Sequence, residues 1–315
     1  MAVTKGGLGL ELDEPLSLGA FEVEQLSIAL VGLTFPVDLS GGVTRFRHRR
    51  GSLEHLALSV RRDRLTASLA SNMRGVLGRA SPTVTVTSIA GGAMIGLVDG
   101  TAALAFDLLW APSETDVRFV VAGARALGLS TPALAAALRA LDGVVGHAGE
   151  RSGATVTFSD AAGIVARQVL PGAGARVPST SDLRWGPLEA DTFGFHAACD
   201  RAFSPPLMAA HVIRELELAG IAEQADSALA ASDLVRAREG YIALLERSPR
   251  DVELARRLAD IDRAIGGRSE AALSTLLEAM PLAEAGFLAG ELLSATGSRE
   301  ASVIALRQAA ERELL

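Results

Sequence analysis

Cysteine and long hydrophobic runs are nearly missing from this chain. Its single cysteine, Cys199, permits no internal disulfide bond and has no second thiol with which to bind a metal. No apolar run approaches the roughly 18–20 residues that span a bilayer. The first stretch of the chain also holds no apolar block long enough for a secretion signal. These absences predict a cytoplasmic protein without a transmembrane segment.

The chain also has fewer basic than acidic residues. The 315 residues carry a formal net charge of −7 and a pI near 5.4, and residues 201–315 alone carry a net charge of −5. Nucleic-acid binding depends on concentrated positive charge, because the protein must neutralise phosphate groups. The composition therefore argues against a nucleic-acid partner.

The sequence lacks the motifs of catalytic, metal and cofactor sites. None of its histidines has the spacing of metal ligands, and the one close pair, His196 and Cys199, would face opposite sides of a strand. Residues 172–174 lack the third glycine and the flanking elements of a dinucleotide loop. No nucleophile elbow, SxxK motif or Walker loop occurs. We therefore expect no enzyme, no catalytic residue, no cofactor and no metal.

The chain does contain enough apolar material for two domains. Hydrophobic residues make up 49% of it, and single hydrophobic cores stop growing near roughly 250–300 residues. Ser204-Pro205-Pro206 marks the expected boundary. Apolar residues mostly alternate before it and follow the helical period after it. The sequence predicts an α+β fold, with an antiparallel β-rich domain and two packed helices in residues 1–203, and an all-α array in residues 207–315.

Short turns separate the strands expected in the N-terminal domain. Asp99-Gly100, between two apolar runs, is the strongest hairpin signal because a two-residue turn needs positive φ. Residues 61–64 are interpreted as another turn, followed by a strand in which Leu65, Ala67 and Leu69 share one face.

Two helices are expected to interrupt these strands. One starts at Thr131-Pro132 and ends near Gly146. The other is capped by Ser159 or Asp160, and its Ile164, Val165 and Val169 are predicted to face inward.

The C-terminal segment DLVRAREGYIALLERSP has the most specific pattern of the chain. Ala237, Tyr241 and Leu244 fall at i, i+4 and i+7, so that a small, an aromatic and an aliphatic side chain share one helical stripe that ends at Pro249. This segment resembles the second helix of a tetratricopeptide repeat. A small position recurs at Ala271 and near Ala301, spacings of 34 and 30 residues, although Thr275 and Ala305 replace the aromatic residue. The resemblance implies stacked helical pairs that bind a protein partner.

The N-terminal domain carries a second resemblance. The phrases LSIALVGLTFPVDLSGG and LRWGPLEADTFGFHAACD, which are strands around a pair of apolar helices, look similar to bacterial proteins of the tubular lipid-binding superfamily. That resemblance implies a curved sheet with an apolar groove. Phe106, Leu108, Trp110 and Leu138 would then line the groove. Ordinary closed packing explains the same pattern.

A row of arginines is the sharpest polar feature. Arg45, Arg47, Arg49 and Arg50 give one predicted strand face a strong positive charge. Such a face suits an acidic partner, a phosphate group or an anionic membrane surface, or it is simply a solvated strand face.

These observations together predict a non-enzymatic scaffold that binds a partner protein through its C-terminal helices. The alternative is a carrier or sensor of a lipid or another apolar ligand, held in the N-terminal domain.

Overall fold

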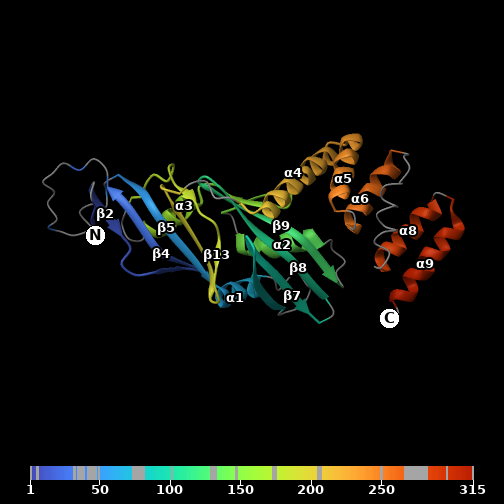
Figure 1. Ribbon diagram of the computed structural model, residues 1–315, viewed down its shortest axis with the longest axis horizontal. Helices are drawn as coiled ribbons and strands as arrows, with labels where there is room; N and C mark the ends of the chain where they lie inside the picture. Colours follow the sequence, from blue (N-terminus) through green and yellow to red (C-terminus); the bar gives the residue numbers. More distant parts are fainter. Residues whose placement is uncertain are drawn as a thin grey trace. The chain divides into compact units, whose positions relative to one another are not determined.

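A computed structural model of the chain describes residues 2–4, 7–30, 33, 40, 48, 50–72, 82–100, 102–127, 133–145, 148–171, 176–203, 208–248, 251–265, 283–295 and 297–313. The chain divides into two compact units, Met1–Leu216 and Glu217–Leu315 (Figure 1). The boundary expected at Ser204-Pro205-Pro206 lies outside the described residues. The observed division falls within a helix, α4 (Ala210–Ala230).

The first sheet contains strands from both ends of the first unit. Its central order is β1-β2-β4-β5-β14-β12, with β3 paired to β4 and β13 paired to β14, and all pairs are antiparallel. The strands are β1 (Ala2–Thr4), β2 (Gly7–Glu11), β3 (Leu16–Leu18), β4 (Phe21–Leu30), β5 (Gly51–Arg61), β12 (Arg184–Trp185), β13 (Glu189–Ala190) and β14 (Gly194–Asp200). The last strand, β14, thus pairs with β5 across more than a hundred intervening residues.

The second sheet is formed by the middle of the first unit. Its strand order is β10-β11-β9-β8-β7-β6, again antiparallel throughout. The strands are β6 (Thr83–Ile89), β7 (Gly92–Asp99), β8 (Ala102–Ser113), β9 (Asp116–Leu127), β10 (Glu150–Ser152) and β11 (Thr155–Phe158). The predicted hairpin is confirmed, because Asp99 pairs with Ala102 and Gly100 has a φ of +61°.

Three helices pack on these sheets (Figure 1): α1 (Arg62–Asn72), α2 (Ala133–Val145) and α3 (Ala161–Val169). Side chains of α3 share a hydrophobic core with the first sheet. Side chains of α1 and α2 share a second core with the second sheet. Each core also includes residues of the other sheet: Trp110 and Val117 belong to the first core, and Val60 and Phe195 belong to the second.

One local prediction in this unit is wrong, and a second is only partly right. The strand expected through Leu65, Ala67 and Leu69 is part of helix α1. Leu65 and Leu69 are four residues apart, which also matches one helical face, and both belong to the second core. Asp63 in the first turn favours the helix, since a negative charge interacts well with its N-terminus.

The second concerns the inward face of α3, where Val169 is buried as predicted and Val165 packs against the first core. Asp160 caps the helix as expected, accepting a hydrogen bond from the Gly163 N–H at 3.1 Å. The buried face is made mostly of small residues, Ala162, Gly163 and Ala166, together with Val169. Ile164 is only partly buried. Close approach of the helix to the sheet selects the small residues. A prediction based on large apolar side chains does not identify them.

The second unit is helical. It contains α4 from Glu217 onward, α5 (Leu234–Arg247), α6 (Val252–Ala264), α8 (Ala283–Ala295) and α9 (Arg299–Glu313). Its core includes Ala225, Ala237, Tyr241, Leu258 and Leu292. Together the two units make a mixed α+β protein, as the sequence predicts. The assignment of these helices to tetratricopeptide repeats stays a prediction.

Two glycines of the helical unit give a matched pair of expected results. A Cβ at Gly240 of α5 would lie 2.7 Å from the Cβ of Ala225 on α4. The helices would have to separate, so we expect Gly240→Ala to cost about 1–3 kcal/mol. A Cβ at Gly220 of α4 meets nothing within 4 Å. Gly220→Ala should therefore stabilise by up to about 1 kcal/mol, because alanine is the better helix former.

Chemical denaturation followed by circular dichroism measures both changes. Effects of the same sign for the two variants would contradict the close contact between α4 and α5.

Candidate interaction site in the helical unit

Capping aspartates fix where α5 and α6 begin. The Asp233 carboxylate accepts a hydrogen bond from the Arg236 N–H at 3.2 Å. The Asp251 carboxylate accepts from the N–H groups of Glu253 and Leu254 at 3.0 and 3.1 Å. Each cap satisfies backbone donors that have no partner within the helix. Residues close to each other in the sequence therefore define where each of the two helices begins.

Small residues let these helices approach closely. Ala237 is fully buried, and Gly240 lies one helical turn away, against Ala225 of α4. Tyr241 fills the space beside them and is itself buried. The ring therefore packs in the core, while its hydroxyl group reaches polar partners at the edge.

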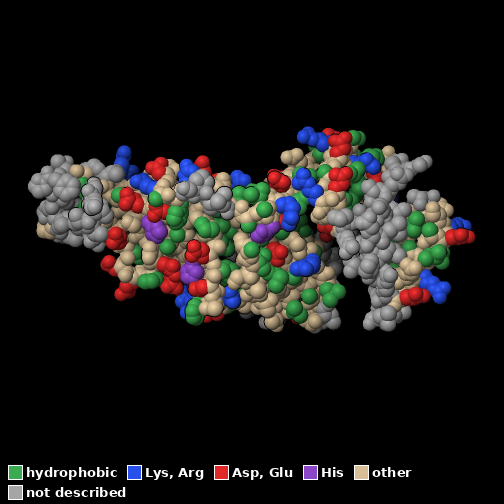
Figure 2. Space-filling model, in the orientation of Figure 1, with side chains coloured by type: hydrophobic (Ala, Val, Ile, Leu, Met, Phe, Trp, Pro, Cys, Tyr) green, Lys and Arg blue, Asp and Glu red, His purple; other side chains and the backbone are tan. Residues whose placement is uncertain are grey.

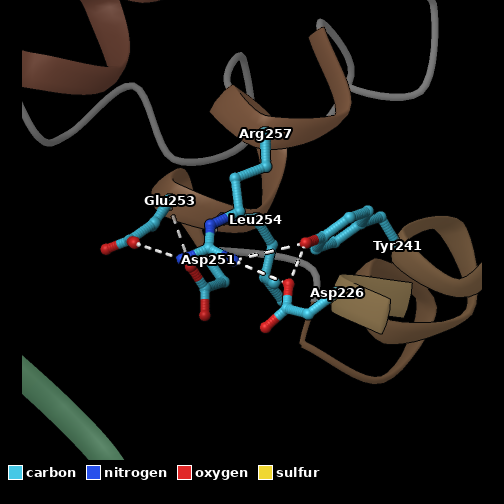
Figure 3. A network of polar contacts seen from close by, with 6 residues as sticks. All are labelled: Asp226, Tyr241, Asp251, Glu253, Leu254 and Arg257. Atoms are coloured by element: carbon cyan, nitrogen blue, oxygen red, sulfur yellow. Dashed lines mark hydrogen bonds and ion pairs between the residues drawn. The ribbon is translucent and has the colours of Figure 1, made fainter. Parts of the chain in front are cut away.

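A polar network joins α4, α5 and α6 at this edge (Figure 3). The Tyr241 hydroxyl donates a hydrogen bond to the Asp226 carboxylate. Arg257 Nη1 donates to the same Asp226 oxygen at 3.0 Å and to the Tyr241 hydroxyl at 3.2 Å. Arg257 Nη2 lies 3.4 Å from the Glu253 carboxylate. One guanidinium thus connects residues from all three helices.

Both carboxylates around Arg257 remain partly exposed, as does Arg257 itself. Charge-assisted hydrogen bonds hold these groups in fixed directions at the surface. Such groups can recognise polar side chains of another protein.

A second ion pair lies deeper between α5 and α6. Arg238 Nε donates to Asp262 Oδ1 at 2.6 Å, where Asp262 is 0% exposed and Arg238 33% exposed. Among the described residues the other oxygen, Oδ2, has no hydrogen-bond partner. Arg238 therefore provides both the opposite charge and a hydrogen bond for this buried carboxylate.

Compared with protein-family models, with curated proteins and with solved structures, the chain matches none. The site must therefore be interpreted from its own geometry.

The structure describes three of the five residues that were predicted to pack the repeats. Ala237, Tyr241 and Leu244 are all buried in the helical core. Pro249 and Ala271 lie outside the described residues. The sequence did not indicate Asp226, Arg238 or Arg257. The sequence pattern could have indicated Asp262. This residue follows Ala255 and Leu258 on the apolar stripe of α6, and a charged side chain on a buried stripe requires a partner.

The predicted arginine patch is only partly covered by the structure. Arg50 is exposed, whereas Arg45, Arg47 and Arg49 lie outside the described residues. Over the surface that Figure 2 displays, acidic and basic side chains are interspersed. The anionic partner of this patch stays a prediction.

The four residues of the predicted apolar groove do not share one lining. Phe106 and Leu138 are buried in the second core, and Leu108 packs against it. Trp110 belongs to the first core, where its indole N–H donates to the Gly186 carbonyl at 3.0 Å. An apolar ligand in this unit stays a prediction.

The structure places His196 and Cys199 in different surroundings. His196 lies between Glu24 and Asp191, at 3.5 and 3.3 Å. Cys199 is buried, and burial, with a smaller effect from Asp200, raises the pKa of its thiol to about 12. Such a thiol is inert at neutral pH.

Within the described ranges no group of three potential metal ligands occurs. None of the helices in these ranges is both long and apolar enough to cross a membrane.

Tyr241 is the only tyrosine of the chain, so its titration can be observed directly. Burial, and then the hydrogen bond to Asp226, raise the pKa of its phenol above the ordinary value of 10.0. We expect phenolate absorbance to rise at higher pH in the native protein than in denaturant. The unfolded chain then loses the proton first, so stability should fall as pH rises above about 10 and level off beyond the folded pKa.

An Asp226→Asn variant serves as the control. It keeps the burial of the ring but removes the negative charge, so the native pKa of Tyr241 should move back toward 10.0. A native phenol that titrates at or below its denatured counterpart would rule out the network in Figure 3.

Proposed function

We propose that the protein is a non-enzymatic scaffold that binds a partner protein through the helices of its second unit. The observation that carries this proposal is close glycine-to-alanine packing in two helical pairs. Gly240 of α5 lies against Ala225 of α4, and Gly286 of α8 lies against Ala309 of α9, with Cβ approaches of 2.7 and 2.8 Å. The glycine is on the second helix of the pair α4–α5 and on the first helix of the pair α8–α9, so both pairs are close-packed through a glycine and an alanine.

The second pair carries a further close contact. A Cβ at Gly290 would lie 2.5 Å from Leu306, and the buried Ser302 hydroxyl donates to the Gly290 carbonyl at 2.7 Å. Helical pairs that stack in this way contact mainly their neighbours and leave extended outer faces for binding. Close packing within helical pairs is typical of such arrays, and it supports a binding role.

The outer faces of α5 and α6 offer polar groups to a partner. Arg236 and Glu239 on α5, and Arg256 and Asp260 on α6, are exposed. Both signs of charge are present, so the expected partner is a polar protein segment with alternating charge. Charge complementarity of this kind gives specificity and fast association more than raw affinity.

Site-specific photo-crosslinking tests the proposal in cells. A photoreactive residue at the exposed Arg256 position is expected to give a discrete protein adduct. The matched control is the same residue at Glu150, an exposed position on β10 of the first unit. The proposal is wrong if Arg256 gives no adduct, or if both positions give the same adducts.

A second control uses the fold of the helical unit. The Arg256 adduct should disappear when Ala237→Arg is added, because that change disrupts the packing of the helices that present the site. An adduct that persists without folded helices would point to nonspecific capture.

A further inference from the structure

An exposed aromatic side chain lies on a turn at one end of the first sheet. Phe193 is 76% exposed, yet its backbone is held on both sides. Its N–H donates to the Asp191 carboxylate at 2.7 Å, and its carbonyl accepts from the Arg62 N–H at 2.8 Å. The ring therefore projects from a turn that is already ordered, so little conformational entropy is lost when it is buried by a partner.

A shallow hollow, wide open to solvent, lies beside this ring. Thr66, Ala67 and Ala70 of α1 and Phe193 itself are among its lining residues. Ala67 is exposed, and its small side chain leaves room for a phenyl ring. The protruding side chain and the wall that could receive a similar one thus belong to the same surface.

The charges at the rim of the hollow are of both signs. Arg61 and Asp63 form a two-point ion pair, with Nε–Oδ1 and Nη2–Oδ2 distances of 3.1 and 2.9 Å, and both side chains are mostly exposed. A neutral pair favours neither an anionic nor a cationic ligand. In a two-fold arrangement, however, Arg61 of one copy can face Asp63 of the other.

The neighbouring Arg62 does not offer a site for an anion. Its Nη2 donates to the Ser88 hydroxyl at 2.8 Å and to the Asp191 carbonyl at 3.0 Å. Its guanidinium carbon lies 6.0 Å from the centre of the Phe195 ring, and its Nε is buried. Arg62 therefore ties α1 to the turn rather than facing a ligand.

We propose that this surface joins two copies of the chain about a two-fold axis. Phe193 of each copy packs against Ala67 and Ala70 of the other, and the Arg61–Asp63 pairs are shared across the axis. A two-fold interface requires one surface to complement itself. The side-by-side ring and hollow, with both charges at the rim, meet that requirement. This proposal concerns the first unit and does not depend on the function of the helices.

Sedimentation of the full-length chain over a wide concentration range tests the proposal. We expect a reversible monomer–dimer equilibrium. Phe193→Ser should weaken association by about tenfold or more, because buried aromatic anchors dominate most interfaces. Ala67→Gln should weaken it too, by filling the hollow from an exposed helix position. Leu127→Ser is the control, because Leu127 is also a large exposed apolar residue, 70% exposed on β9, and should leave association unchanged.

Charge exchange gives an independent test. Arg61→Asp alone places two negative residues on each copy, and Asp63→Arg alone places two positive residues, so each variant should associate more weakly with itself. A mixture of the two variants, or the double exchange in one chain, should restore association. The proposal is overturned by a chain that stays monomeric throughout. It is equally overturned by dimerisation that is insensitive to Phe193→Ser, or by a monomer that binds lipid vesicles through Phe193.

Discussion

An Ala237→Arg variant is expected to lose at least about 3 kcal/mol of stability in the helical unit. Ala237 is fully buried in the helical core. One turn further along α5, Gly240 lies close to Ala225 of α4. An arginine side chain at position 237 can neither fit into such packing nor find a partner for its charge. The helices must separate or the unit must unfold, and a lower melting temperature followed by circular dichroism would record either result.

Val235→Arg is the matched control. It places the same charge on the same helix, two residues away, at a side chain that is 63% exposed. Its effect should stay within about 0.5 kcal/mol, as for most surface substitutions. If Ala237→Arg melts at the temperature of the unaltered protein, the helical packing described above is wrong.

Removing Arg238 should produce the second large effect. Arg238→Met is expected to cost about 3–5 kcal/mol, because it leaves the fully buried Asp262 carboxylate without its ion-pair partner. Asp262→Leu should cost less. The remaining guanidinium is one-third exposed and can keep its charge in water, with its stem against apolar surface.

A double-mutant cycle separates the two contributions. Arg238→Met together with Asp262→Leu removes both charges, so the double variant should be more stable than Arg238→Met alone. Urea denaturation of the four proteins gives the coupling energy. Additive effects, or equal losses from the two single changes, would contradict a buried ion pair at this position.

Features set by near neighbours in the sequence could be predicted well. The Asp99-Gly100 hairpin forms because its turn needs a positive φ, which Gly100 supplies. Asp160 caps α3, as predicted, by accepting a hydrogen bond from the Gly163 N–H three residues further along the chain. Each of these signals depends on a few adjacent residues.

The sequence pattern gave a wrong prediction where the same residues fit both the strand period and the helical period. Leu65 and Leu69 suit one face of a strand and one face of a helix alike, and only their burial beside the second sheet selects helix α1. The inward face of α3 was predicted only in part. Val169 is buried as predicted, but close packing against the first sheet also selects the small residues Ala162 and Ala166.

The sequence by itself determined the α+β class and the small-to-aromatic stripe of α5, because the strand alternation and the helical period are visible in short stretches of the chain. Tertiary structure decided which distant groups meet. It brings β14 beside β5, Arg257 beside Asp226 and Arg238 beside Asp262. No spacing in the chain encodes these pairs. They form because a buried charge needs a partner and a sheet strand needs a neighbour, and only the folded chain supplies both.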